Sequence, residues 1–513
     1  MSNTWTTSEG TETGPELLLA LRGGGRRPVR ARLEQALRDA VRDGRLAPGD
    51  RLPSSRALAA DLGVARGVVV EAYAQLVAEG WLDARQGSGT RVARPVWFPG
   101  PPGPRTPGRD LGLGSGPPAP HAPERDAGLR SGPASRERAG GRPSGPGAGL
   151  DQPRFDFVPG RPDLSAFPRT AWLAALRRVL AGLPASGLGY PDPGGAPALR
   201  AALAAYLGRV RGVIADPDLI VVTSGYGQAL ALLSRVLHDR GVRTIAFEDP
   251  LNPEPTRVAA HAGLCPVGVP VDGAGLDVDA LAASRAGAAV VTSAHQFPTG
   301  VVLAPERRTA LLAWAATRAG VVLEDDYDAE YRYDREPVGA MQALGPDLVA
   351  YAGSVSKTLA PGLRLGWLVA PRALAGELVE AKRLDDHGSN VLDQLTLAEL
   401  LGSGVYDRHL RRTRRAYRAR RDLLVGTLAV HAPGIRVRGV AAGLHVVVEL
   451  PAGADERAVA DAARRRGVGV YPLGGYRTGS AATFPPALVV GYGGLAPADV
   501  RAGAERLAEV LPG

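Results

Sequence analysis

A stretch of chain without an apolar pattern divides this sequence into two parts. Residues 94–151 are dominated by Pro, Gly, Arg, Ser and Ala, and apolar residues do not recur there at helical or strand spacing. Such a segment cannot bury enough apolar area to offset the entropy lost on ordering, so we expect a flexible, disordered linker. The 513 residues therefore predict separate domains over residues 26–93 and 152–513.

Composition limits the kinds of protein this chain can be. Apolar residues make up 45% of it, and no apolar run reaches a membrane-spanning length. Cys265 is the only cysteine, which excludes an intrachain disulfide and fits a reducing compartment. The polar start Met1–Gly10 lacks the apolar segment of a secretory signal, and the histidines show no metal-ligand spacing. We therefore expect a cytoplasmic protein with no membrane contact and no metal site.

The N-terminal part predicts three helices followed by a hairpin. In the first helix, apolar residues recur at i, i+4 and i+8, at Leu33, Leu37 and Val41. Ser54 is placed to cap a second helix that Gly63 ends, and a third helix is expected over 66–79. The tight loop 86–89 then joins two short strands. This order is typical of a winged helix-turn-helix.

The sequence of this module resembles those of the GntR family of bacterial regulators. The matching segments are Gly44-Arg45-Leu46-Ala47-Pro48-Gly49-Asp50, Leu62-Gly63-Val64-Ala65-Arg66 and Gly87-Ser88-Gly89-Thr90. The resemblance implies a module that binds a double-stranded DNA operator, with contacts at Arg56, Arg66, Gly67, Val68 and Gly89. A winged helix used only for protein contact is the alternative.

One departure from the GntR pattern falls at the start of the third helix. Recognition helices of that family usually open Ser-Arg-x-Thr, whereas this chain has Ala65-Arg66-Gly67-Val68. The apolar positions of the helix are intact, so we expect it to fold. Two hydroxyls that cap the helix or bind phosphate are missing. We therefore expect either a lower affinity for DNA or an operator that differs from those usual in the family.

After the linker, helices alternate with short β-branched runs. Buried strands are predicted at 219–222, 244–247, 289–292, 321–323 and 348–351. This alternation is typical of an α/β unit with a largely parallel sheet. Later the pattern changes to long helices with strands at 445–448, 469–471 and 488–491. We expect a large part over about 190–370 and a small α+β part over about 385–513.

One turn in the large part carries the groups that pyridoxal 5′-phosphate (PLP) requires. Ser354-Val355-Ser356-Lys357 follows a predicted strand, and Arg364 lies shortly after it. The amine can form a Schiff base with the aldehyde of PLP, while hydroxyls and a guanidinium hold its phosphate. A surface loop with a chance lysine is the alternative, and residues elsewhere in the chain favour the cofactor site.

Two further segments supply the rest of such a site. Thr223–Leu230 follows a strand and opens a helix whose backbone N–H groups suit a phosphate. Glu324-Asp325-Asp326-Tyr327 ends another strand, where a carboxylate can keep the pyridine nitrogen of PLP protonated.

Together these segments resemble the fold-type I, class I aminotransferases over most of the chain after the linker. Joined to a GntR module, and with His295-Gln296-Phe297-Pro298-Thr299-Gly300, they are typical of the MocR/PdxR-type regulators. By this resemblance Lys357 forms the Schiff base, Asp325 binds the pyridine nitrogen and Tyr327 binds the ring hydroxyl. The resemblance places Ser224, Gly225, Tyr226, Ser354 and Arg364 around the phosphate, and His295 and Pro298 along the ring. It also implies a head-to-tail homodimer.

Two departures from this pattern bear on the cofactor and the effector. These regulators usually read Glu-Asp-Pro-Gly-Tyr-Pro-Gly, with the tyrosine stacked on the cofactor, but Asn252 stands in its place within 248–254. Loss of that stacking costs about 0.5–1.5 kcal/mol. Aminotransferases also hold the substrate carboxylate with an arginine in a late strand, which 487–492 lacks. Arg477 is the nearest substitute for binding an effector carboxylate.

Three functions share this fold. The first is a transcriptional regulator whose aminotransferase-like domain senses PLP, or an amine or amino-acid effector, with weak or no transaminase activity. The second is a catalytically active PLP-dependent aminotransferase, which Lys357 and Asp325 favour. The third is a DNA-binding regulator that has lost PLP, which Asn252 favours. We expect the first, because the sequence joins a DNA-binding module to a cofactor site that lacks the late-strand arginine.

Overall fold

The computed structural model describes residues 28–43, 45–85, 89–93, 153–333, 339–479 and 484–512. The linker expected over 94–151 lies outside these residues, as do residues 26 and 27 of the expected N-terminal domain. The tip of the hairpin at 86–88 lies outside them as well.

The N-terminal module contains the three expected helices and the hairpin. Its elements are α1 (Val29–Arg42), α2 (Ser55–Leu62), α3 (Arg66–Ala78), β1 (Leu82–Arg85) and β2 (Gly89–Val92). The side chain of Ser54 accepts a hydrogen bond from the Ala57 N–H and so caps α2, and Gly63 ends α2 with a left-handed φ of 63°. The two strands pair antiparallel, with Leu82 opposite Val92. Leu33, Leu37, Val69 and Leu76 are buried between the helices, because the apolar residues recur at helical spacing.

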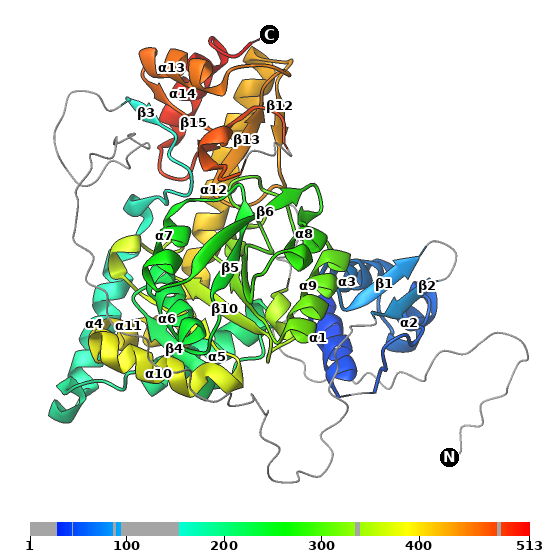
Figure 1. Ribbon diagram of the computed structural model, residues 1–513, viewed down its shortest axis with the longest axis vertical. Helices are drawn as coiled ribbons and strands as arrows, with labels where there is room; N and C mark the ends of the chain where they lie inside the picture. Colours follow the sequence, from blue (N-terminus) through cyan, green and yellow to red (C-terminus); the bar gives the residue numbers. More distant parts are fainter. Residues whose placement is uncertain are drawn as a thin grey trace, which may run out of the picture. The chain divides into compact units, whose positions relative to one another are not determined.

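The large part of the body contains an eight-stranded sheet (Figure 1). In spatial order its strands are β4 (Ile220–Thr223), β11 (Gly366–Val369), β10 (Val349–Ser354), β9 (Val321–Asp325), β8 (Ala288–Val291), β5 (Thr244–Asp249), β6 (Cys265–Asp272) and β7 (Gly275–Leu276). The five strands from β10 to β6 run parallel, and β11 runs antiparallel to both of its neighbours. The expected α/β class and largely parallel sheet are confirmed.

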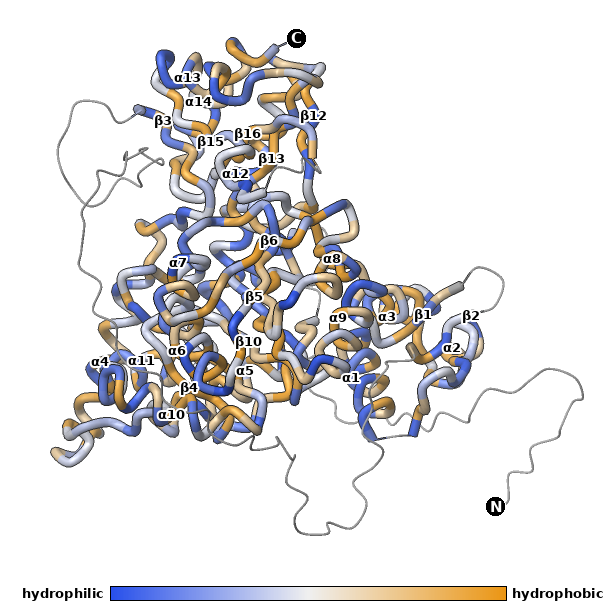
Figure 2. The backbone as a smooth tube through the Cα atoms, viewed as in Figure 1, coloured by the Kyte–Doolittle hydropathy of each residue, from blue (hydrophilic) through white to orange (hydrophobic). Residues whose placement is uncertain are grey.

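Helices cover both faces of this sheet because successive side chains of a buried strand point to opposite faces. In β4, Val221 packs into a core with α6 (Tyr226–Asp239), α7 (Glu254–His261) and α10 (Arg372–Asp386). Its neighbour Val222 packs into a core with α5 (Pro197–Val210) and α11 (Val391–Gly402), which α4 (Arg169–Gly182) also covers. Farther along the sheet, α8 (Val278–Ala283) and α9 (Pro305–Arg318) form a third core. In Figure 2 these helices alternate between polar and apolar residues, as helices with one buried face must.

The small part is a four-stranded sheet flanked by helices. The strand order is β12 (Arg436–Arg438), β13 (His445–Glu449), β16 (Ala487–Gly491) and β15 (Tyr471–Pro472), and the helices are α12 (Val405–His431), α13 (Glu456–Arg465) and α14 (Pro497–Ala508). The segment that enters the body joins this part, because β3 (Phe155–Asp156) pairs with β14 (Val468–Gly469). Phe155 and Phe157 are buried in the core of the small part, beside Leu488 and Val490. In Figure 1, β3 (cyan) accordingly lies among the orange and red elements.

The described residues contain neither a membrane-spanning helix nor a group of metal ligands. Among them, no helix is long and apolar enough to cross a membrane. In the same parts of the chain, no three His, Cys, Asp or Glu side chains are grouped so that they could hold a metal ion.

Candidate cofactor site and DNA-binding surface

The N-terminal ends of α2 and α3 carry most of the predicted DNA contacts. Arg56, Arg66 and Gly67 are exposed there, and Val68 is half-buried. Arg66 Nε donates a hydrogen bond to Ser55 Oγ over 3.4 Å, which brings the starts of the two helices together. The residue that precedes α3, Ala65, makes no side-chain cap. The first turn of α3 therefore presents an arginine and backbone N–H groups that no side chain caps, a combination that binds phosphate.

Two arginines that the sequence did not single out lie at the hairpin, one on β2 and one on the segment before α2. Gly89 opens β2 with a left-handed φ of 81°, and a Cβ at this position would lie 3.2 Å from Arg51 Nε. Arg51 and Arg91 form an isolated antiparallel bridge, and Arg91 Nη1 donates to the Gly49 carbonyl over 3.1 Å. Arg51 therefore lies beside Gly89, the predicted contact at the wing, and Arg91 follows two residues later on β2. Arg51 is far from Gly89 in sequence, so only the fold brings them together.

Lys357 lies in the turn after β10, where several polar groups meet. Its Nζ donates a hydrogen bond over 2.7 Å to the carbonyl oxygen of Gly160, which has a left-handed φ of 71°. Burial lowers the pKa of Lys357, although the carboxylates of Asp328 and Asp325 act in the opposite direction. A lowered pKa increases the fraction of neutral amine, which is the nucleophilic form.

Asp325 and Asp326 are adjacent at the end of β9 and have different surroundings. Burial raises the pKa of Asp325 well above its usual range, neighbouring carboxylates add to this, and Lys357 opposes it. Asp326 instead accepts hydrogen bonds from Arg211, over 2.7 Å from Nε and 3.1 Å from Nη2. Asp326 is thus bonded within the protein, whereas Asp325 would gain from a cationic partner such as a protonated pyridine nitrogen.

The candidate phosphate cradle lies where β4, β11 and α6 meet. Gly225 precedes α6 with a left-handed φ of 95°, and a Cβ there would lie only 3.1 Å from Arg364 Nη2. β11 lies between β4 and β10, with Gly366 opposite both Thr223 and Ser354. The register therefore brings together Gly225, Arg364 and Ser354, beside Ser224 and Tyr226. A guanidinium at a helix N-terminus is suited to an anion.

The ring-lining residues form a buried hydrogen-bonded group. The Tyr327 hydroxyl lies 3.1 Å from His295 Nδ1, and the same nitrogen lies 2.9 Å from Asp328 Oδ2. Pro298 follows a cis peptide bond, and its carbonyl accepts a hydrogen bond over 3.0 Å from His445 Nε2. Sequence reasoning missed Asp328 and His445. A signal existed only for Asp328, which directly follows the acidic strand end.

The structure also adds Glu248 to this region. Burial raises its pKa to about 7, although Thr292 donates to Glu248 Oε2 from both its backbone N–H and its hydroxyl. Glu248 acts electrostatically on Tyr226 and Asp325, whose own pKa values burial raises. A second carboxylate therefore lies near the predicted pyridine partner.

Arg477 and Asn252, the two residues singled out where the sequence departs from the family pattern, both form hydrogen bonds to the backbone. Arg477 Nη2 donates to the Phe484 carbonyl over 2.9 Å. The segment just before it lies beside Phe297, whose ring centroid is 5.4 Å from that of Tyr476. Asn252 is exposed, and its Oδ1 accepts a hydrogen bond from the Glu254 N–H at the start of α7. Asn252 thus bonds the backbone at a helix start and offers no aromatic face.

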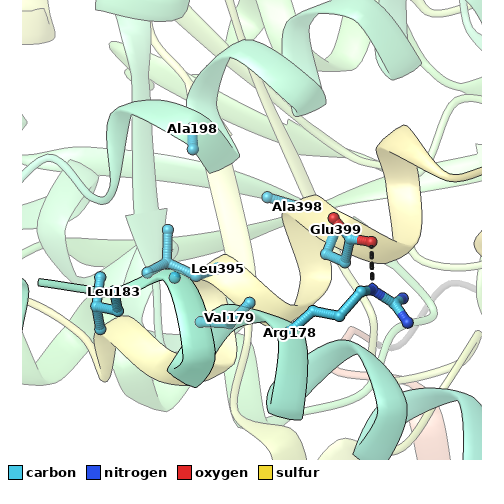
Figure 3. Close-up of a pocket in the computed structure, with 8 residues that line it drawn as sticks. Arg178, Val179, Leu183, Ala198, Leu395, Ala398 and Glu399 are labelled. Carbon is cyan, nitrogen blue, oxygen red and sulfur yellow. Dashed lines mark hydrogen bonds and ion pairs between the residues drawn. The ribbon is translucent and has the colours of Figure 1, made fainter.

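A separate cavity of about 430 Å³ lies away from these residues, between α4, α5 and α11 (Figure 3). Arg178 Nε donates to Glu399 Oε1 across it over 2.9 Å. The rest of the wall is mostly apolar and is formed by Val179, Gly182, Leu183, Ala198, Leu395 and Ala398. None of the predicted site residues contributes to this wall.

The residues around Lys357 fit PLP by their chemistry. The amine has a lowered pKa, burial outweighs the charge of Lys357 in its effect on the pKa of Asp325, and the Arg364 guanidinium packs directly against Gly225 at the start of α6. These are the three groups that an aldehyde, a pyridine nitrogen and a phosphate need. PLP is also the cofactor that the family match and the solved neighbours described next imply.

Two family models match the chain. Residues 29–92 match "Bacterial regulatory proteins, gntR family" and residues 161–507 match "Aminotransferase class I and II". The chain is also similar to the alanine:glyoxylate aminotransferase of an archaeon, with 27% identity and a TM-score of 0.64 over 71% of this chain and 91% of that one. It is also similar to LysN, the α-aminoadipate aminotransferase of Thermus thermophilus, with 28% identity and a TM-score of 0.61 over 70% of this chain and 92% of that one.

Relatives with both domains match nearly the whole length. The chain is 33% identical to the pyridoxine biosynthesis transcriptional regulator PdxR of Corynebacterium glutamicum, over 91% of this chain and 92% of that one. It is 32% identical to the probable rhizopine catabolism regulatory protein MocR of Rhizobium meliloti, over 94% and 93%. With a winged helix-turn-helix before a fold-type I aminotransferase domain, the chain belongs to the MocR/PdxR-type transcriptional regulators of the GntR family.

Proposed function

We propose that this regulator binds PLP at Lys357 and that occupancy of the site by PLP, or by an amine or amino acid that reacts with it, changes operator binding. The observation that carries the proposal is the placement of Lys357 Nζ, held at Gly160 and close enough to Asp325 and Asp328 for their charges to act on it. PLP, when bound, supplies an aldehyde that captures primary amines covalently. An effector acts as a switch only if it binds two arrangements of the protein with different affinity.

Each predicted site residue has one role in this proposal. Lys357 binds the aldehyde, Asp325 the pyridine nitrogen and Tyr327 the ring hydroxyl. The phosphate is held by Ser224, Gly225, Tyr226, Ser354 and Arg364, and His295 and Pro298 line the ring. Operator contacts come from Arg56, Arg66, Gly67, Val68 and Gly89, and Arg477 is assigned to an effector carboxylate once it leaves Phe484. The domain boundaries proposed are 26–93, 94–151 and 152–513.

We further propose that the protein acts in the cytoplasm as a homodimer. A regulator of this family works where the chromosome is, which supports the first point. Support for the second comes from large apolar side chains exposed on and just after α4, namely Leu173, Leu180, Leu188 and Tyr190. The cavity of Figure 3 is lined in part by the same helix. An apolar surface of this kind is typical of a protein–protein contact.

The names of the relatives point to two classes of effector. PdxR is named for pyridoxine biosynthesis and MocR for rhizopine catabolism. A site built for PLP is compatible with either PLP itself or an amine as the signal. An aminotransferase with sustained turnover is the alternative, because Lys357 and Asp325 are both present, and so is a regulator that has lost PLP, because Asn252 replaces the stacking tyrosine.

The small number of lysines in the chain makes it straightforward to locate a Schiff base. Lys357 and Lys382 are the only two lysines in the sequence. Lys382 is fully buried, and its Nζ donates to Asp386 and Ser389. A Schiff base on a lysine side chain can therefore be located by distinguishing two peptides.

The first experiment is to add PLP to the purified protein, record the visible spectrum, and trap the adduct with borohydride. We expect a band that borohydride bleaches, a modified Lys357 peptide by mass spectrometry, and no band in Lys357→Ala. Lys382→Arg is the matched control and should keep the band. Absence of a band at saturating PLP would mean that the cofactor has been lost. Steady turnover of amino-acid and keto-acid pairs would instead support the aminotransferase.

A further inference from the structure

A glutamine side chain is bonded to the candidate phosphate cradle. Gln228 is the third residue of α6, and its Oε1 accepts a hydrogen bond over 2.8 Å from the backbone N–H of Ser224. Ser224 and Gly225 lead into the first turn of this helix, where the N–H groups of Gly225 and Tyr226 have no partner within the helix. The bond to Gln228 therefore fixes the Ser224 backbone and leaves these two N–H groups to an anion.

The other end of this side chain is held by two carboxylates at the end of α10. Gln228 Nε2 donates to Asp385 Oδ2 over 2.7 Å and to Asp386 Oδ2 over 2.9 Å, which uses both hydrogens of the amide nitrogen. An ionised carboxylate only accepts hydrogen bonds, so the amide nitrogen must face the two aspartates and the amide oxygen must face Ser224. The chemistry of the partners therefore determines the orientation of the amide.

Each carboxylate also has a cationic partner. Arg235 Nη2 lies 2.9 Å from Asp385 Oδ1, and Lys382 Nζ lies 2.6 Å from each oxygen of Asp386. Although burial alone would raise it, hydrogen bonds from Gln228 and Lys382 hold the pKa of Asp386 below its ordinary value. This carboxylate is therefore ionised near neutral pH and remains an acceptor for the amide.

Packing of α6 against α10 keeps the glutamine and the aspartates together. Leu230 of α6 and Leu378 of α10 belong to one buried core, and the two helices lie side by side in Figure 1. Just past the end of α10, the backbone N–H of Gly388 donates to Asp386 Oδ1 over 2.8 Å. The acceptors of Gln228 are therefore fixed relative to the start of α6.

We propose that Gln228 is a positioning residue that makes this site selective for a phosphorylated ligand. The inference rests on the proposed function, because it requires the phosphate of PLP at the start of α6. Gln228 acts there in two ways. It holds the backbone of Ser224, a proposed phosphate partner, and its neutral amide lies between the helix start and two negatively charged side chains. Since like charges repel, a neutral group in this position favours binding of the phosphate dianion.

Pyridoxal makes the contribution of the phosphate measurable. It has the ring and the aldehyde of PLP but no phosphate, so both ligands can react with Lys357 and only PLP can occupy the cradle. The ratio of the two dissociation constants therefore reports the contacts of the phosphate. A residue needed only for folding, or only for the ring, would change both constants together.

The test titrates the full-length protein and its variants with each ligand and follows the visible band. We expect Gln228→Leu, which keeps the bulk of the side chain and removes the amide, to weaken PLP binding by about tenfold, the scale of one hydrogen bond to a charged group. Its affinity for pyridoxal should change by less than about twofold. Gln228→Glu should weaken PLP binding further, because a carboxylate then lies beside two aspartates and the phosphate.

Gln35→Leu is the matched control. Gln35 is on α1 and also donates to a carboxylate, with 2.8 Å between its Nε2 and Asp39 Oδ1. This variant should leave both dissociation constants unchanged. Circular dichroism and melting temperature identify any variant that fails to fold, and Gln228→Glu keeps the test decisive if Gln228→Leu is one of them.

Each remaining outcome has one interpretation. Equal losses of affinity for PLP and pyridoxal in Gln228→Leu would show a role in folding or ring binding and would overturn the inference. Unchanged PLP binding in either Gln228 variant, or equal affinity of the wild type for the two ligands, would do the same. Absence of a visible band in the wild type with either ligand would instead contradict the proposed function, so the two failures are distinguishable.

Discussion

At Gly225 the absence of a side chain leaves room for a guanidinium. A Cβ there would lie 3.1 Å from Arg364 Nη2, and the backbone has a left-handed φ of 95°. The sequence could predict Gly225, Lys357 and Asp325 because each belongs to a short motif at a strand end. It could not predict that His445 contacts His295, because the two residues are 150 positions apart and on different parts of the body. Single residues were thus predictable where chemistry follows a local motif, and not where packing joins distant elements.

Glu248 gives a prediction about pH at the residue scale. Its folded pKa is about 7, above the ordinary value of 4.5, because burial disfavours the charged form. Between these two values the folded protein binds the proton more tightly than the unfolded chain, so Glu248 reduces stability as pH rises from 4.5 to 7. Glu248→Gln removes the ionisation. The free energy of unfolding of the variant, relative to that of the wild type, should therefore increase by on the order of 2–3 kcal/mol between pH 5 and pH 8.

The measurement is urea denaturation of the apo protein at both pH values. Taking the difference between variant and wild type cancels the other groups that titrate in this range. A difference that stays constant with pH would contradict the assignment of a raised pKa to Glu248.

At the scale of elements, helices with caps and apolar spacing were predictable, whereas two strands that contain proline or glycine were not. The second and third helices begin and end within a residue or two of the positions expected. β6 was missed because Pro266 and Pro270 interrupt it, which is tolerable near a sheet edge. β11 was missed because it is short and carries Gly366 and Trp367 in place of a β-branched run. This strand joins the two halves of the phosphate cradle, so that part of the site could not be assembled from the sequence.

The start of α3 carries the prediction for DNA binding. Arg66 is exposed at the first position of this helix, and its Nε donates to Ser55 Oγ. Arg66→Ala should weaken binding to an operator selected from random DNA with the wild-type protein, by about 1–3 kcal/mol at fixed salt. Fluorescence anisotropy measures the affinity. Arg45→Ala, which removes an arginine whose side chain is 50% exposed, is the control and should cost much less. Equal losses would mean that only net charge matters.

At the scale of the whole molecule, the sequence predicted the order and class of the domains because the pattern of apolar residues differs between them. Apolar residues recur at helical spacing in the N-terminal module, and helices alternate with β-branched runs after the linker. Its composition and periodicity could not give the state of association, for which only the family resemblance implied a homodimer, because association depends on a surface assembled from separate elements. The exposed side chains Leu180 and Leu188 belong to such a surface, at 48% and 61% exposure. The chain gave no periodic signal for them, since exposed leucines look like buried ones in a sequence.

This surface gives a prediction about assembly. The wild type should have twice the chain mass of 53.2 kDa by light scattering, because burying the exposed leucines favours pairing. Leu180→Glu with Leu188→Glu should shift it toward the monomer. Leu384→Glu, at a leucine 68% exposed on α10, is the matched control and should stay paired. A monomeric wild type would refute the proposed dimer, and a monomeric control would mean that the interface lies elsewhere.

The burial of Lys382 has a practical consequence for studying this regulator. Because this lysine is enclosed and bonded to Asp386, an amine-reactive dye has little to attack besides the α-amino group and Lys357. Dye incorporation at Lys357 should fall as ligand fills the site, since the same amine cannot react twice. Labelling of Lys357 therefore reports the fraction of sites that hold ligand, and mass spectrometry can measure it in a crude extract without an engineered tag.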